Sequence, residues 1–134
     1  MKETLLPGAT GEVRHRVVTE NLVSHVNPKG PAVLATPWVL SMMEHAAYNA
    51  IQPHLDDGEQ SVGVGFEFQH IAPTPAGAQV VATAEVTSIE GMMVTLTIEA
   101  RDEHEVIARG LHKRGVIRVE SFAKRVARKT KAQQ

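Results

Sequence analysis

The chain has 134 residues, of which 43% are hydrophobic and 22% charged, and its net charge is −1 at neutral pH. This length suits one domain with its own core, and so small a net charge creates no field that would attract nucleic acid. No apolar run approaches the roughly 20 residues that cross a bilayer, and the N-terminus has no signal pattern. We therefore expect no nucleic-acid or membrane partner and a cytoplasmic location.

The first half of the chain predicts one strand, one loop and one long helix. Residues 11–18 alternate and favour a strand, and the proline- and glycine-marked residues 27–31 favour a loop. Thr36 is a typical N-cap residue, and Pro37 suits the first helical position. From residue 38 to about 51 there is no helix breaker, and the residues are apolar nearly all round. We therefore expect this helix to be buried inside the domain.

Four further strands are predicted after the helix, at residues 61–71, 79–88, 92–101 and 106–119. Glu90-Gly91 stands where a hairpin turn belongs, and strands joined by short hairpins are antiparallel. The predicted fold class is α+β, with an antiparallel sheet of about five strands wrapped around one central helix. We expect a single domain over residues 1–134, with residues 1–10 and 121–134 as peripheral termini.

The alternation predicts two further details of the strands. Alternation over residues 61–71 predicts two faces: Val62, Val64, Phe66, Phe68 and His70 on one side, and Gly63 and Gly65 on the other. Irregular alternation in the last strand predicts a bulge near Gly110. The tail from Ser121 carries five Lys and Arg residues and no acid, and predicts a short, frayed helix.

Glu44 is the most informative polar residue, because it lies two turns into a helix otherwise committed to burial. A buried carboxylate is rare without a partner, and burial raises its pKa toward the range of a general base. The alternative places Glu44 on the exposed edge of the helix, beside His45 and Tyr48. The pattern alone leaves these two interpretations equal.

The other polar candidates favour structural explanations when each is taken alone. Thr36 is explained as an N-cap whose hydroxyl accepts a hydrogen bond from an unpaired backbone N–H group. The same helix N-terminus would also stabilise the oxyanion of a thioester under attack. His70 ends an apolar strand face, and Arg114 alone is interpreted as an exposed charge on the sheet. The seven histidines have no metal-ligand spacing, and cysteine is absent, so no metal site is predicted.

Several sequence blocks resemble the fluoroacetyl-CoA thioesterase family, a branch of the hot-dog thioesterases. They are the helix block 35–46, residues 58–63 with His70, residues 74–77, residues 110–117 and the tail from 122 to 130. The resemblance covers nearly the whole chain from residue 11. It implies a hot-dog fold and a catalytic set of Thr36, Glu44 and His70.

The same resemblance implies that Gly63 and Arg114 contact the substrate, a short-chain acyl-coenzyme A. Coenzyme A enters as part of the substrate, and no other cofactor is implied. Arg114 and the basic tail are candidates to hold the anionic coenzyme A arm. The loop before Thr36 looks shorter than in the family and has no aromatic residue, and Pro37 and Trp38 also depart from it. Specificity for a fluorinated acyl group is therefore not carried over.

Helix geometry adds an expectation about assembly. Thr36 and Glu44 are eight residues apart, about 12 Å along a helix axis, so direct contact within one chain is not expected. If both act on one thioester, Thr36 of one subunit pairs with Glu44 of another across a two-fold axis. We expect a homodimer, with a tetramer as a further assembly. Alternative functions are a hot-dog enoyl- or hydroxyacyl-CoA hydratase-dehydratase and a non-catalytic acyl-CoA binding domain.

Overall fold

The computed structural model describes residues 1–133, which form one antiparallel sheet, one long central helix and a C-terminal helix. Short 3-10 turns, η1 and η2, follow the first strand and the central helix. In chain order the elements are β1 (Thr10–Arg16), η1 (Thr19–Asn21), α1 (Val23–Val26), α2 (Thr36–Ile51), η2 (Gln52–His54), β2 (Glu59–His70), β3 (Gln79–Glu90), β4 (Met93–Arg101), β5 (Val106–Arg118) and α3 (Val119–Ala132).

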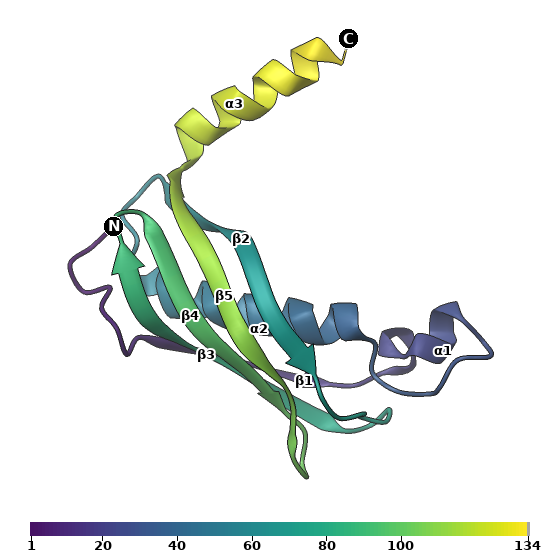
Figure 1. Cartoon of the computed structure of the whole chain (residues 1–134). Helices are drawn as coiled ribbons and strands as arrows, with labels where there is room; N and C mark the ends of the chain where they lie inside the picture. The colour runs from purple at the N-terminus through teal and green to yellow at the C-terminus, as the bar shows by residue number, and fades with distance from the viewer. Residues whose placement is uncertain (134) are drawn as a thin grey trace.

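The five strands form a single sheet in the order β1-β3-β4-β5-β2, and every pairing is antiparallel. Figure 1 shows this sheet curled, with α2 lying across one of its faces. Hairpins connect β3 to β4 and β4 to β5, with Gly91 in the first turn as predicted. The predicted α+β class, with about five strands around one helix, is confirmed.

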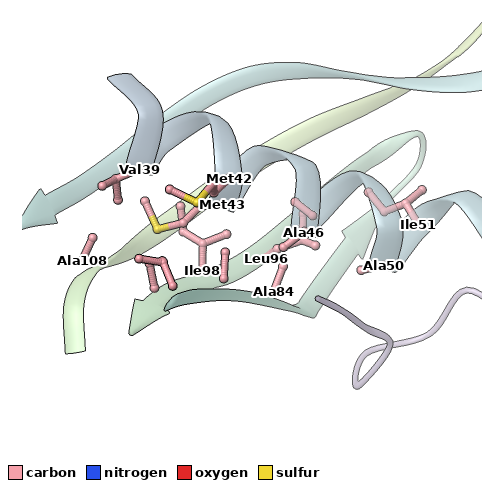
Figure 2. Close-up of a cluster of buried hydrophobic side chains, with 14 of the residues drawn as sticks. Val39, Met42, Met43, Ala46, Ala50, Ile51, Ala84, Leu96, Ile98 and Ala108 are labelled. Atoms are coloured by element: carbon pink, nitrogen blue, oxygen red, sulfur yellow. The ribbon is translucent and has the colours of Figure 1, made fainter. Parts of the chain in front are cut away.

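The core lies between α2 and the inner face of the sheet. Figure 2 shows side chains of α2, among them Met43, Ala46 and Ile51, facing Leu96 and Ile98 of β4. All five are at most 2% exposed. On the opposite side of the helix, however, the side chain of Trp38 is 44% exposed. The expectation that α2 is buried all round is therefore wrong on that side, because the sheet covers only part of the helix.

A β-bulge in β2 changes which residues face inward. Gly63 faces Arg114 of β5 and Gly65 faces Lys113, so Val64 is the extra residue. An extra residue reverses the alternation of a strand at that point. The predicted single face with Val64 and Phe66 is therefore wrong: Gly63 faces inward before the bulge, and Phe66, Phe68 and His70 face inward after it.

The bulge predicted near Gly110 lies three residues earlier in β5: the register shifts between the pairs Ala100–Ala108 and Arg101–Val106, so Ile107 is the extra residue. Gly110 keeps an unbroken register with both neighbouring strands, opposite Phe68 of β2 and Ile98 of β4. A Cβ atom at this position would overlap the carbonyl oxygen of Glu67 and the backbone of Phe68. Gly110 is explained by this close approach of β2 to β5, not by the bulge at Ile107.

The basic tail forms a longer helix than predicted. α3 spans 14 residues, none of them buried, and Figure 1 shows it projecting from the end of β5 away from the sheet. Its exposed apolar residues include Phe122 and Val126. Within residues 1–133, no helix is both long enough and apolar enough to cross a membrane.

Candidate active site

The start of α2 brings Thr36 and His70 into contact within one chain. The Thr36 hydroxyl lies 2.9 Å from Nδ1 of His70, which is the last residue of β2. Ala35 is the N-cap residue, and Thr36 and Pro37 follow it in the first turn. The prediction that Thr36 is the N-cap is therefore wrong by one position, and its hydroxyl is available to the histidine.

His70 has one ring nitrogen without a partner. Burial lowers the pKa of His70 below its ordinary value, so the ring is neutral at neutral pH. One nitrogen shares a hydrogen bond with Thr36, and the buried Nε2 has no hydrogen-bond partner. Unsatisfied buried polar atoms are rare in native proteins, and a catalytic role is one of the explanations for such an atom. The pair borders a pocket of about 270 Å³ that Leu34 and Ile71 also line.

Glu44 lies in a different cluster, two turns further along α2. Its Oε2 accepts a hydrogen bond from Nη1 of Arg114 at 3.2 Å and lies 4.0 Å from Nε2 of His112. The Glu44 side chain is 44% exposed in the single chain, so the structure supports neither full burial nor a purely external position. It lines a pocket of about 440 Å³ together with Tyr48 and Gly63.

Arg114 is buried, and its guanidinium is held at every nitrogen. Nε donates to the Ser61 hydroxyl at 2.9 Å, Nη2 donates to the Ser61 carbonyl at 2.9 Å, and Nη1 donates to Glu44. Burial lowers the pKa of the guanidinium, and the Glu44 carboxylate raises it, so the group stays charged. The interpretation of Arg114 as an exposed sheet charge is wrong, because it is only 4% exposed. Its position opposite Gly63 directs it inward.

Gly63 leaves the space that the Glu44 carboxylate occupies. A Cβ atom at this position would overlap Oε2 of Glu44 and lie 3.5 Å from Cε1 of His112. Any side chain here would displace the carboxylate or the imidazole. The glycine is thus explained by contact with Glu44, whether or not a substrate also reaches it.

The five candidate residues therefore form two separate groups in one chain. The first group, the N-terminal half-site, is Thr36 with His70. The second group, the carboxylate half-site, is Glu44 with Gly63 and Arg114. The two groups line different pockets, as the spacing along the helix predicts. A larger hollow of about 790 Å³ on the outer face of the sheet contains none of the five.

Sequence reasoning missed Ser61 and His112, which complete the carboxylate half-site. Both are buried polar residues, and each lies two positions from a candidate on the same strand: Ser61 from Gly63, and His112 from Arg114. Period-two spacing was the available signal, since residues two apart share a strand face. Within residues 1–133, no three His, Asp or Glu side chains are grouped so that they could hold a metal ion.

His70, which is partly buried, and His112, which is fully buried, predict a pH dependence of stability. Burial is the main cause that lowers the folded-state pKa of His70 and of His112, so below about pH 6.5 the unfolded chain binds more protons than the folded chain. The free energy of unfolding should therefore fall as the pH is lowered from 7 to 5, and the melting temperature should fall with it. A His70→Asn, His112→Asn double variant should lose less free energy of unfolding between pH 7 and pH 5. A melting temperature that is flat or rises toward pH 5 would contradict the prediction.

Comparisons with known proteins show which family the chain resembles. The model of the family described as fluoroacetyl-CoA-specific thioesterase matches residues 17–120. A curated relative, the fluoroacetyl-CoA thioesterase of Streptantibioticus cattleyicolor, is 37% identical over 116 residues, which cover 82% of this chain and 84% of the relative.

Solved structures show the same fold. A mutant of the fluoroacetyl-CoA-specific thioesterase FlK superposes with a TM-score of 0.86 at 33% identity, covering 96% of this chain and 99% of that chain. A Thermus thermophilus member of the thioesterase superfamily gives 0.86 at 25% identity, covering 97% and 98%. A hot-dog-like protein from Thermanaerovibrio acidaminovorans gives 0.84 at 28% identity, covering 92% and 91%. The predicted hot-dog fold is therefore confirmed. Other FlK structures hold fluoroacetate with CoA, or acetyl-CoA.

Proposed function

This chain belongs to the fluoroacetyl-CoA-specific thioesterase family, and we propose that its substrate is a short acyl group carried on coenzyme A. As a thioester hydrolase it releases a free acid and the CoA thiol. A short acyl group is supported by the small volume beside Thr36 and His70, about 270 Å³, which is less than most drug-sized ligand sites have. Solved relatives that hold acetyl-CoA or fluoroacetate support an acyl group of about this size.

The observation that carries the proposal is a carboxylate held beside an open pocket by a buried arginine. In our mechanism Glu44 attacks the thioester carbonyl carbon or activates the water that does so. The carbonyl lies near the N-terminus of α2, whose partial positive charge stabilises the developing oxyanion. Thr36 hydrogen-bonds the reacting centre, and His70 polarises the carbonyl or transfers the proton. A C–O bond forms as the C–S bond breaks, and the CoA sulfur takes up a proton. Where Glu44 itself attacks, the acyl group is held on its carboxylate as an anhydride, and water then cleaves this anhydride to release the acid and regenerate Glu44.

One complete site requires both half-sites, and a dimer formed through β2 supplies them. β2 is an edge strand of 12 residues that pairs with β5 alone, and exposed edges of this length invite pairing with another chain. Gly63 and His70 lie equally far from the midpoint between Phe66 and Glu67. Antiparallel pairing of two β2 strands about that midpoint would set Gly63 beside His70 of the partner subunit. Each site would then combine the carboxylate half-site of one subunit with the N-terminal half-site of the other.

The coenzyme A arm is assigned to the basic residues of α3. The guanidinium of Arg114 already has partners at all three nitrogens, so it holds Glu44 more directly than it can hold a phosphate. In α3 the side chains of Lys124, Arg125, Arg128 and Lys129 are exposed. A substrate contact by Arg114 or Gly63, assembly into tetramers and a cytoplasmic location stay predictions.

The substrate class is tested with a panel of acyl-CoA thioesters, from acetyl-CoA and fluoroacetyl-CoA to long-chain forms. We expect release of free thiol, with the highest kcat/KM for acyl chains of about two to four carbons, because the pocket is small. Chromatography of the products separates the alternatives: hydration of an enoyl-CoA leaves the thioester intact, whereas hydrolysis does not. Binding without turnover for every member of the panel would refute hydrolysis.

A further inference from the structure

His112 is a fully buried histidine that the proposed mechanism does not use. It lies on β5 with 0% exposure, and its ring stacks on Phe66 of β2, with centroids 3.8 Å apart and planes 10° apart. Nδ1 lies 2.8 Å from the carbonyl oxygen of Gly65, at the bulge. Since a carbonyl can only accept, Nδ1 carries the ring proton and donates it to Gly65.

The other nitrogen of the same ring faces the carboxylate half-site. Nε2 lies 3.2 Å from Nη1 of Arg114 and 4.0 Å from Oε2 of Glu44. With the proton on Nδ1, a neutral ring has a lone pair on Nε2, which accepts a hydrogen bond from Arg114. Burial and, to a smaller extent, the charge of Arg114 lower the pKa of His112, which keeps the ring neutral near pH 7.

The guanidinium of Arg114 is therefore fixed from three directions. Ser61 accepts bonds from Nε and Nη2, while Nη1 is shared between Nε2 of His112 and the carboxylate of Glu44. Without His112, Nη1 would keep only the partly exposed carboxylate as a partner. The orientation of Nη1 would then depend on the two bonds to Ser61 and on a carboxylate that is 44% exposed.

We propose that His112 is a positioning residue: its Nε2 orients the Arg114 guanidinium, which in turn places the Glu44 carboxylate for reaction. The inference rests on the proposed role of Glu44 in thioester hydrolysis. It adds His112 to the five candidate residues. It also links the β2 bulge to the Glu44 carboxylate through a series of contacts.

Two substitutions separate the functions of the two ring nitrogens. In His112→Asn the amide nitrogen lies near the position of Nδ1 and can still donate to Gly65, but no acceptor reaches Arg114. In His112→Gln the amide oxygen lies near the position of Nε2 and can accept from Arg114, whereas the bond to Gly65 is lost. His104→Asn, at an exposed position in the turn between β4 and β5, is the matched control.

In a thiol-release assay with the full chain, we expect His112→Asn to lower kcat about tenfold or more with KM within about twofold, as loss of a bond to a charged group implies. His112→Gln should keep kcat within about threefold and lose melting temperature instead. A merely structural role would move stability without this split between the variants. Equal kcat in both variants would overturn the proposal. If His112→Asn does not fold, the kcat of His112→Gln decides: a fall in kcat beyond about threefold would overturn the proposal.

NMR of the arginine side chain provides a readout that does not depend on activity. Restricted rotation should give separate Nη signals for Arg114 in the wild-type protein and in His112→Gln, and these should merge in His112→Asn. Unchanged signals in His112→Asn would overturn the proposal even if hydrolysis is confirmed. If the wild-type protein releases no thiol, the proposed function fails, while the NMR comparison still decides whether His112 orients Arg114.

Discussion

Replacing Glu44 by Gln is expected to lower kcat for a short acyl-CoA by roughly 10²–10⁴-fold, the usual contribution of a general acid or base. Gln has nearly the same shape, and its amide oxygen can still accept the 3.2 Å hydrogen bond from Arg114. The substitution therefore removes negative charge and basicity while it leaves the half-site packed. Thiol release from acetyl-CoA, with KM determined in parallel, measures the effect.

The matched control for this prediction is Glu85→Gln, an exposed carboxylate on β3 that lines the hollow on the outer face of the sheet and not the Glu44 pocket. It should retain wild-type kcat and KM. Circular dichroism and melting temperature should be close to wild type for both variants, since neither opens a cavity. Near-normal turnover by folded Glu44→Gln would remove Glu44 from the mechanism.

Mixing two inactive variants is expected to restore activity. Thr36→Ala removes the hydroxyl that contacts His70, and Glu44→Gln removes the carboxylate, so each homodimer should be inactive at both sites. In a mixed dimer with composite sites, one site contains both defects and the other contains none. Random mixing makes about half of the dimers mixed, so about a quarter of wild-type specific activity should return.

A second mixture gives the opposite result from the same two substitutions. When a chain with both Thr36→Ala and Glu44→Gln pairs with a wild-type chain, each composite site contains one defect, and the mixed dimer should be inactive. If each site lay within one chain, this dimer would keep half its activity and the first mixture would show no rescue. Differently tagged chains allow the mixed dimers to be purified before thiol release is measured.

Much of the site could be predicted because its signals are local or belong to the family. Glu44 could be recognised because it is a carboxylate in an apolar helix, and His70 because it lies at the end of a strand. The half-sites could be separated as well, because helix rise per residue sets the distance from Thr36 to Glu44. The interpretation of Arg114 as an exposed charge was wrong, because strand alternation does not tell which face of β5 is covered.

The sequence by itself determined the helix, the five strands, the family and the five candidate residues, because each depends on neighbouring residues or on motifs in register. Only the tertiary structure decided that Gly63 and His70 share the inner face of β2. The bulge at Val64 that reverses the strand arises where β2 pairs with β5, about 50 residues away in the chain. The contacts of Arg114 with Ser61, His112 and Glu44 have the same origin, since they join β5 to residues of β2 and α2. Pairing between distant segments is not encoded in local periodicity, and it is this pairing that places the carboxylate.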